Sequence, residues 1–435
     1  MRSLATRRVK PEHGTAPAWV VPKSAAELVD SLIEEALAWG ASDVHLEPNE
    51  EGMQVRFRVH GFLQNVMTVP QRERAAVVSR IKIMANLDIA EHRLPQDGRI
   101  RIRRNGHAVD ARVSTIPSLH GEKVVLRLLD LNGVAIPVDR VGLRAGHLQE
   151  LRRLIRRPQG IILVTGPTGS GKTSTIYACL KEIKSEAINI ITIEDPIEYE
   201  ISGVTQIAVH DKIGLTFEGC LRSVLRQDPD VILVGEIRDR ETARIAMQAS
   251  LTGHLVFATL HTNDAVGAIT RLLDMEIPPY LIASSLSGVL AQRLVQVLCP
   301  ACKVPAKRDA DLCAKLLDPT GSRLYQRGPG CDKCHGLCAV GRIGVFELVT
   351  VTPKVRSLII TRASEAELRE AAHSDAFPSM FQDGLVKVAD GQVAYDELMR
   401  VTEPDRARAD ELPPDPAPAP PPKPALVPLR VIPLN

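Results

Sequence analysis

Residues 166–173 carry glycines, a lysine and a threonine at the spacing of a phosphate-binding loop. The run reads G-P-T-G-S-G-K-T, which matches the G-x-x-x-x-G-K-[ST] pattern. The glycines let backbone N–H groups turn towards an anion, and the following helix adds the positive end of its dipole. We expect Lys172 to reach the β- and γ-phosphates of ATP and the Thr173 hydroxyl to bind Mg²⁺. The predicted nucleotide-binding residues are Gly166, Pro167, Thr168, Gly169, Ser170, Gly171, Lys172, Thr173 and Ser174.

The segments on either side supply the strand and the helix that such a loop requires. Residues 160–165 are mostly aliphatic or β-branched and predict a buried strand, and residues 174–183 predict a helix. A chance glycine-rich turn is the alternative interpretation, and this strand–loop–helix context disfavours it.

Two acidic segments follow apolar strands further along the chain. The strand predicted at 231–235 leads into Glu236, and nucleotide hydrolysis needs a carboxylate near the γ-phosphate to orient water or hold the hydration shell of the metal. Glu194, Asp195 and Glu198 crowd into five positions, which is costly unless a cation such as Mg²⁺ compensates. Glu236 is the first choice for the catalytic carboxylate, and Glu194 and Glu198 are candidates to position water or metal. An ordinary strand-end glutamate and a solvated acidic turn are the alternatives.

Histidine and arginine side chains are further candidates. His261 follows the strand predicted at 254–260 and is expected at the carboxyl edge of the sheet, near the γ-phosphate, whereas His254 equally suits a structural hydrogen bond. Guanidinium groups suit a γ-phosphate in transit because they are planar and permanently charged, and they can act from a neighbouring subunit. A surface ion pair is the alternative for each arginine. The arginine candidates are Arg112, Arg127, Arg222, Arg226 and Arg238.

The cysteines are unevenly spaced. Cys299-x-x-Cys302 and Cys331-x-x-Cys334 form two knuckles, and Cys313 and Cys338 lie nearby in sequence; two others, Cys179 and Cys220, are isolated. In a reducing compartment, paired knuckles indicate a metal site more than disulfides, and four thiolates suit tetrahedral Zn²⁺. The zinc would be structural, since no position stays open for water. Buried free thiols are the alternative.

The pattern of elements predicts an α/β fold with more than one domain. Residues 23–131 mix helical and strand patterns and predict a small domain, and 132–141 is a predicted linker. Over 142–402, strands alternate with helices, which predicts a largely parallel sheet covered by helices. The strands of that sheet are expected near 160–165, 188–193, 204–209, 231–235 and 254–260, and further helices at 263–275, 278–297, 355–361, 364–372 and 377–390.

Composition excludes some classes of function. The net charge is only +2 and aromatic residues make up 3%, which argues against a nucleic-acid partner. No apolar run has the length of a membrane span, so we expect a cytoplasmic protein that reaches the inner membrane through partners. Residues 1–22 are a predicted flexible leader, and the proline-rich residues 403–435 a predicted extended tail.

Together these segments resemble the traffic ATPases of type II secretion and type IV pilus assembly. The resemblance spans most of the chain and is strongest in short blocks. Residues 87–91 and 93–99 look closer to the secretion branch, and retraction motors of the pilus branch typically lack the four-cysteine insert. The matching blocks are residues 41–48, 94–99, 166–173, 194–198, 225–230, 235–239 and 260–262.

The resemblance implies a RecA-like P-loop NTPase motor domain, a smaller PAS-like α+β domain before it and a zinc-binding insert at 297–342. It also implies a homo-hexamer in which Arg112 and Arg127 approach ATP from the amino-terminal domain. Such a motor drives an inner-membrane platform protein and docks on a bitopic membrane protein. The expected function is therefore ATP-driven pseudopilus assembly for type II secretion. Pilus extension, DNA translocation and a non-hydrolysing scaffold are the alternatives.

Three features depart from the family pattern. Only about 22 residues precede the match, where secretion ATPases usually carry a further docking domain. His60 stands where the family usually has Asp, and Gln296 stands where Arg is usual. Neither belongs to the phosphate loop, so the expectation of hydrolysis is unaffected.

Overall fold

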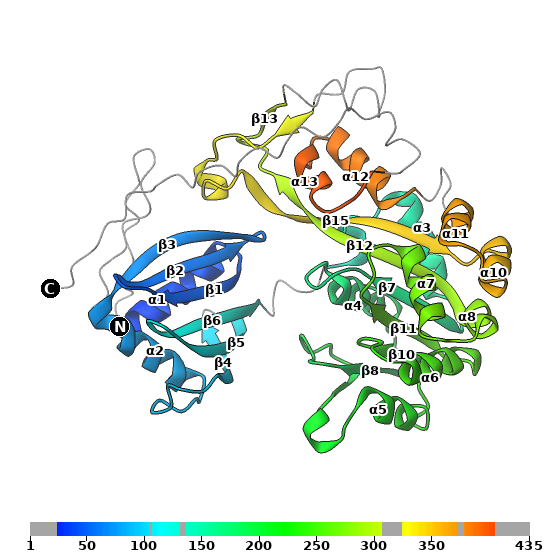
Figure 1. The fold of residues 1–435 in the computed structure, drawn as a ribbon, viewed down its shortest axis with the longest axis horizontal. Coiled ribbons are helices and arrows are strands. Elements are labelled where there is room, and N and C mark those ends of the chain that lie inside the picture. Colours follow the sequence, from blue (N-terminus) through cyan, green and yellow to red (C-terminus); the bar gives the residue numbers. More distant parts are fainter. Residues whose placement is uncertain (1–23, 105–106, 131–135, 307–323, 373–377, 405–435) are drawn as a thin grey trace. The chain divides into compact units, whose positions relative to one another are not determined.

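The computed structural model describes residues 24–104, 107–130, 136–306, 324–372 and 378–404 (Figure 1). These residues divide into two compact units, one before and one after residues 131–135. The predicted leader, most of the predicted tail, part of the predicted linker and Cys313 lie outside the described residues.

The first unit is a six-stranded antiparallel sheet with two helices, in the strand order β3-β2-β1-β6-β5-β4. The helices pack against each other and against the β1–β3 side of the sheet. In β2 the buried side chains alternate with half-exposed ones, as the sequence pattern predicts. The elements are α1 (Ala25–Ala38), β1 (Ala41–Pro48), β2 (Gly52–Val59), β3 (Phe62–Pro70), α2 (Gln71–Met84), β4 (Gln96–Arg104), β5 (His107–Ser118) and β6 (Gly121–Asp130).

Local signals explain where these elements begin and turn. The Ser24 hydroxyl accepts a hydrogen bond from the Glu27 N–H at 3.2 Å and caps α1, as predicted. The β2–β3 hairpin turns through His60 and Gly61, both at positive φ (50° and 93°), which is the signature of a tight two-residue turn.

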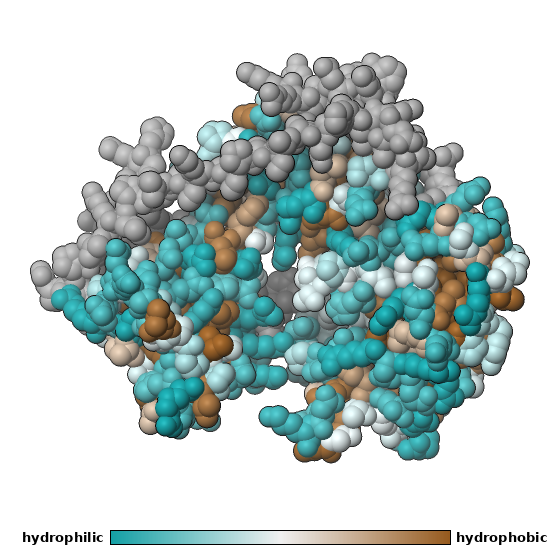
Figure 2. All heavy atoms as spheres, viewed as in Figure 1, coloured by the Kyte–Doolittle hydropathy of each residue, from teal (hydrophilic) through white to brown (hydrophobic). Residues whose placement is uncertain are grey.

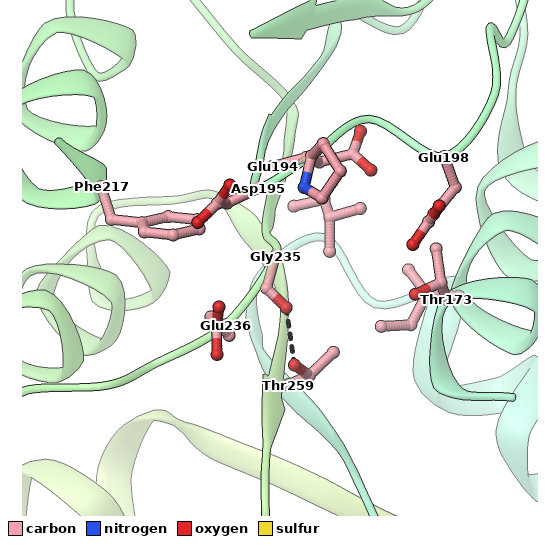
Figure 3. Close-up of a pocket in the computed structure, with 11 residues that line it drawn as sticks. Thr173, Glu194, Asp195, Glu198, Phe217, Gly235, Glu236 and Thr259 are labelled. Carbon is pink, nitrogen blue, oxygen red and sulfur yellow. Dashed lines mark hydrogen bonds between the residues drawn. The ribbon is translucent and has the colours of Figure 1, made fainter. Parts of the chain in front are cut away.

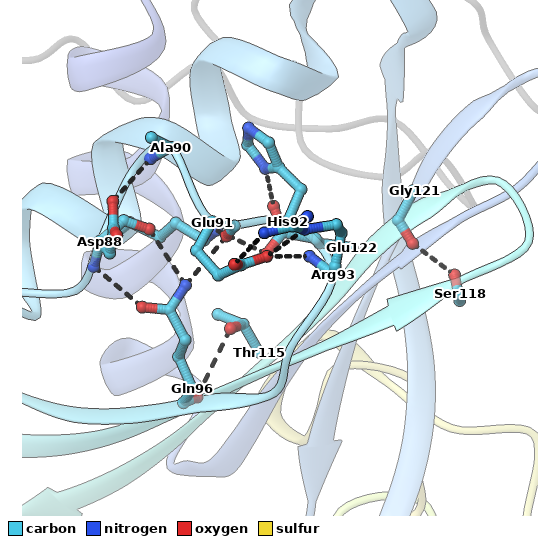
Figure 4. Close-up of polar contacts among 11 residues, drawn as sticks. Asp88, Ala90, Glu91, His92, Arg93, Gln96, Thr115, Ser118, Gly121 and Glu122 are labelled. Carbon is cyan, nitrogen blue, oxygen red and sulfur yellow. Dashed lines mark hydrogen bonds and ion pairs between the residues drawn. The ribbon is translucent and has the colours of Figure 1, made fainter.

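The loop between α2 and β4 is held by polar contacts (Figure 4). Gln96 Nε2 donates to the carbonyls of Asp88 and Glu91, each at 3.0 Å. The fully buried Lys82 pairs with Glu122 at 2.6 Å, and Glu122 also contacts His92 Nδ1 at 2.7 Å. These contacts fix one of the sequence blocks on which the family resemblance depends.

The second unit is a seven-stranded sheet in the order β15-β12-β7-β11-β10-β8-β9. All neighbours are parallel except the β12–β15 pair, so the prediction of a largely parallel sheet is confirmed. The strands are β7 (Gly160–Thr165), β8 (Ile190–Glu194), β9 (Thr205–Ala208), β10 (Val231–Val234), β11 (Leu255–Leu260), β12 (Leu286–Leu298) and β15 (Ala339–Thr350).

Helices cover both faces of this sheet. Alternate side chains of β7 therefore enter two different cores. Ile161 and Leu163 of β7 pack into a core with α5–α8, whereas Ile162 and Val164 pack into a second core with α3 and α4. The helices are α3 (Ala145–Ile155), α4 (Lys172–Ile183), α5 (Phe217–Val224), α6 (Arg240–Leu251), α7 (Ala265–Asp274), α8 (Pro279–Ser285), α10 (Pro353–Ile360), α11 (Glu365–Ala372), α12 (Met380–Ala389) and α13 (Tyr395–Met399).

The helix predicted over 278–297 is wrong. Only α8 is helical there, and the chain then enters the 13-residue strand β12, which pairs with β7 and β15. This strand is mostly buried on both faces, so apolar residues occupy both alternating sets of positions and their periodicity does not distinguish strand from helix. The β-branched Val289, Val295 and Val297 are the local signal for a strand.

A small insert follows β12 and contains the cysteine knuckles. Its described elements are the two-residue strands β13 (Val304–Pro305) and β14 (Tyr325–Gln326), which pair with each other, and a 3₁₀ turn at Asp332–Cys334. The visible faces of both units are mostly hydrophilic with scattered apolar residues (Figure 2). None of the helices among the described residues combines the length and the apolar character needed to cross a bilayer.

Candidate nucleotide site and cysteine cluster

The phosphate loop joins the end of β7 to the start of α4. Gly169 and Gly171 adopt positive φ values of 80° and 88°, which side chains disfavour. A Cβ on Gly166 would lie 2.4 Å from the carbonyl oxygen of Gln292, so only glycine fits this close approach. The loop pattern read from the sequence therefore has a steric basis in its surroundings.

Lys172 folds back over the loop. Its Nζ donates to the carbonyl oxygens of Gly166 at 2.8 Å and Pro167 at 3.1 Å. Burial lowers the pKa of Lys172; Glu236 opposes this change and Arg293 adds to it. An anion in the loop would offer this ammonium a charged acceptor in place of neutral carbonyls.

Strand β12 holds the loop from behind through one glutamine. Gln292 Nε2 donates to the Ser170 carbonyl at 2.7 Å, and its Oε1 accepts from the Thr175 hydroxyl at 2.8 Å. Gln292 is almost fully buried. Gln292 was not predicted, because residues 278–297 were assigned to a helix and nothing there distinguishes it from the polar residues Arg293 and Gln296.

A pocket lies beside the loop, where β8 and β10 end and α4 begins (Figure 3). Thr173 lines it together with Glu194, Asp195, Glu198 and Glu236. Figure 3 shows the Glu198 carboxylate pointing towards Thr173. The parallel strands therefore bring the loop hydroxyl and the acidic residues to one edge, as predicted. Two other lining residues, Phe217 and Thr259, were not among the predicted site residues.

Glu236 lies in a charged environment that is open to solvent on one side. Its side chain is 18% exposed and forms an ion pair with Arg238, which also reaches Asp195 Oδ2 at 3.3 Å. His261 Nε2 lies 3.7 Å from Glu236 Oε2. Burial lowers the pKa of His261, Lys172 lowers it further, and Glu236 raises it in part.

Glu194 is buried and fully engaged. One carboxylate oxygen accepts from the Tyr177 hydroxyl, and the other accepts from Thr192 Oγ1 at 2.6 Å and Gln206 Nε2 at 3.1 Å. Burial, together with the hydrogen bond to Glu194, raises the pKa of Tyr177 well above its usual range, so this phenol stays protonated as a donor. Tyr177 and Gln206 were not predicted, because nothing in the sequence signals their pairing.

The four knuckle cysteines come together in the insert. All their sulfurs lie within 4.8 Å of one another, with Cys299–Cys331 at 3.8 Å, Cys302–Cys334 at 3.6 Å and Cys331–Cys334 at 3.7 Å. Zinc–sulfur bonds of 2.3 Å in a tetrahedron separate the sulfurs by about 3.8 Å. The donor set and the spacing both fit Zn²⁺.

Comparison with known proteins assigns the family. The family model described as type II/IV secretion system protein matches residues 22–400. The chain is 52% identical over 377 residues to type II secretion system protein E of Pseudomonas aeruginosa. The aligned region covers 86% of this chain and 75% of that protein. The chain is 51% identical over 379 residues to type II secretion system ATPase E of Vibrio cholerae, with 87% and 75% covered. The chain belongs to the type II/IV secretion family.

Solved structures of related ATPases agree. The pilus retraction motor PilT with bound ADP is 28% identical, with a TM-score of 0.62 over 88% of this chain and 98% of that one. The DotB ATPase of Legionella pneumophila is 20% identical, with a TM-score of 0.64 over 89% and 98%, and supports the fold alone. The chain is thus an ATPase with a RecA-like motor domain and a smaller PAS-like domain before it.

Other predicted residues of this secretion ATPase lie elsewhere. Arg222 and Arg226 belong to α5 and its C-terminal end and line a second surface depression, away from the phosphate pocket of the same chain. Arg222 pairs there with Glu218 at 3.1 Å and with Glu241. His254 Nδ1 contacts the Ala249 carbonyl at 2.9 Å, at the start of β11, which fits a structural hydrogen bond.

Arg112 and Arg127 lie in the first unit, directly opposite each other on β5 and β6. The Arg127 side chain is 63% exposed, and its Nε donates to Asp43 Oδ1 at 2.9 Å. Residues directly opposite in an antiparallel pair share one face of the sheet, so the two guanidinium groups are presented together.

Proposed function

We propose that the chain is the hexameric motor of a type II secretion system, which hydrolyses ATP to assemble the pseudopilus and export proteins. The observation that carries this proposal is the pocket in which Thr173 and four carboxylates meet beside Lys172. Identity of about one half to type II secretion E proteins supports the secretion branch.

The contacts support separate tasks for the residues of the pocket. Thr173 would bind Mg²⁺, and Glu198 would hold the metal's water shell. Glu236 would orient the attacking water, since it is partly exposed and not locked by neutral donors. His261 would contact the γ-phosphate as a neutral imidazole, because its pKa is lowered. Glu194 would anchor the acidic segment through its buried hydrogen bonds.

Arginines would complete the site when subunits assemble. Arg112 and Arg127 would approach ATP from the domain at 23–131, and turnover would move this domain against the domain at 142–402 through the linker at 132–141. Arg238 would release Glu236 or Asp195 when nucleotide binds, whereas Arg222 and Arg226 would act across a subunit boundary. The high exposure of the Arg127 side chain supports a role in which it contacts ATP bound to a neighbouring subunit.

The proposed partners are an inner-membrane platform protein and a bitopic secretion protein. These partners would recruit the cytoplasmic ring to the membrane, so the ring would need no membrane-spanning helix. The four cysteines would hold one structural zinc that stabilises the insert. Type IV pilus extension is a second candidate function, because the chain shares its fold with a pilus motor, the retraction motor PilT. Copurification with the platform protein of a secretion system, rather than with that of a pilus, would distinguish the two candidate functions.

The proposal is tested with the full chain, by measuring its mass in solution and its phosphate release with Mg-ATP. We expect a six-subunit assembly with nucleotide, and loss of turnover in Lys172→Ala, because the loop loses the cation that binds the phosphates. Glu276→Gln is the control, since Glu276 is exposed, pairs with Arg240 and does not line the pocket. Equal phosphate release by Lys172→Ala and the control would refute the proposed motor.

A further inference from the structure

A fifth cysteine lies against the four-cysteine cluster. The Cys338 sulfur is 3.4 Å from the Cys302 sulfur, close to van der Waals contact. Cys338 does not belong to the set of four whose sulfurs all lie within 4.8 Å of one another. The cluster therefore holds one thiol more than a tetrahedral metal uses, and the sulfur of that thiol lies against Cys302.

Backbone contacts fix Cys338 in this position. Its sulfur accepts the N–H of Gly328 at 3.1 Å, its own N–H donates to the Cys334 sulfur at 3.2 Å, and its carbonyl accepts the N–H of Cys299 at 2.9 Å. A residue held at sulfur, nitrogen and oxygen does not swing into the metal site. Its thiol is instead held towards Cys302.

The two thiols differ in access to solvent. Cys302 is half-buried, whereas Cys338 is 2% exposed. A small oxidant therefore reaches Cys302 first and finds Cys338 directly behind it, which is the arrangement of an attacked thiol and its resolving partner. Among the described residues, the other isolated cysteines, Cys179 and Cys220, are buried and lie outside this cluster.

We propose that Cys302 and Cys338 form a site of reversible thiol oxidation by peroxides, and that their disulfide withdraws one ligand from the metal. This step rests on the proposed zinc site. The Cys302 sulfur attacks one peroxide oxygen, the O–O bond breaks, and Cys302 becomes a sulfenic acid. The Cys338 sulfur then attacks Cys302, the S–S bond forms, and the hydroxyl leaves as water.

The step balances in atoms and electrons. Two electrons pass from the two sulfurs to hydrogen peroxide, which ends as two molecules of water. One proton comes from the Cys338 thiol, and one comes from solvent because the zinc-bound Cys302 carries none. Three thiolates would then remain to hold the zinc. Because the Cys302 thiolate no longer binds it, the ion is released to a chelator.

The experiment uses the full chain, purified in the reduced state with its zinc content measured first. Samples of wild type, Cys338→Ala and the control Cys220→Ala are treated with hydrogen peroxide, and released zinc is followed with a coloured chelator. Peptide mapping without reduction then identifies disulfides, and zinc content is measured again after reductant and zinc are added. None of these readouts depends on ATP turnover.

We expect a Cys302–Cys338 disulfide in wild type and in Cys220→Ala, with full recovery of zinc after reduction. Cys338→Ala starts with the same zinc content, but Cys302 proceeds to the irreversible sulfinic acid and zinc is not recovered. Absence of the disulfide from oxidised wild type, or equal recovery in all three proteins, would overturn the proposal. Loss of zinc from Cys338→Ala before oxidation would also overturn it, since zinc binding would then depend on Cys338 itself. A wild-type chain purified without zinc would refute the metal site. The proposed withdrawal of a metal ligand would then be refuted as well.

Discussion

Glu194 and Glu236 come from neighbouring strands of one sheet, yet their surroundings differ. Glu194 is 3% exposed, and the neutral donors Tyr177, Thr192 and Gln206 share its two oxygens. Glu236 is partly exposed and faces the solvent-accessible side chains of Arg238 and His261. A carboxylate held by neutral donors in the interior is suited to hold a strand end in place, whereas one beside solvent-accessible side chains can accept water or metal.

The largest effect on folding is expected when the Glu194 carboxylate is removed. Glu194→Ala removes the acceptor of the buried Tyr177 and Thr192 hydroxyls and one acceptor of the part-buried Gln206. We expect this change to cost about 2–4 kcal/mol in the free energy of unfolding. Glu236→Ala is the matched comparison and is expected to cost less than about 1 kcal/mol, since its partners reach solvent. Chemical denaturation of both variants measures the difference, and equal losses would contradict the distinction.

A smaller change removes only one donor of that network. Tyr177→Phe keeps the buried ring and deletes the hydroxyl that contacts Glu194, so we expect a loss of about 1–2 kcal/mol. Because Tyr177 is on the helix that follows the phosphate loop, turnover should fall through kcat with little change in nucleotide affinity. Tyr199→Phe, on the edge of the same cluster, is the control; an unchanged denaturation midpoint in Tyr177→Phe would argue against the network.

The smallest effect is a shift in the titration of His261. The negative charge of Glu236 favours the protonated imidazole and so raises its pKa, although burial and Lys172 keep the net change downward. Glu236→Gln is therefore expected to lower the pKa of His261 further, and Glu194→Gln to leave it unchanged. NMR titration of the His261 ring measures both, and the same shift in the two variants would show that the carboxylates act alike.

The sequence predicts the parallel sheet and its phosphate loop well because both depend on local signals. Strands β7, β8, β10 and β11 are short, mostly apolar runs, and the glycines of residues 166–173 are fixed by backbone geometry. Strand β12 was misread as a helix because a strand buried on both faces has no alternation to detect. Its Gln292 was lost with it.

Contacts between distant segments were the part that sequence could not predict. Tyr177, Gln206 and Glu194 meet only after α4, β8 and β9 have packed together. In the same way, the spacing of the cysteine knuckles predicts four ligands, but the position of Cys338 against Cys302 depends on how the insert folds. Such pairings are set by tertiary structure, and no local pattern marks them.

Glu236 is proposed to serve hydrolysis and Glu194 to serve structure. Phosphate release from the purified Glu236→Gln variant, with ATP affinity measured on the same sample, tests this difference. We expect ATP to bind as in wild type and hydrolysis to fall about 10²-fold or more, because water loses the carboxylate that orients it. Undiminished phosphate release from Glu236→Gln, with nucleotide bound, would contradict a role of Glu236 in hydrolysis.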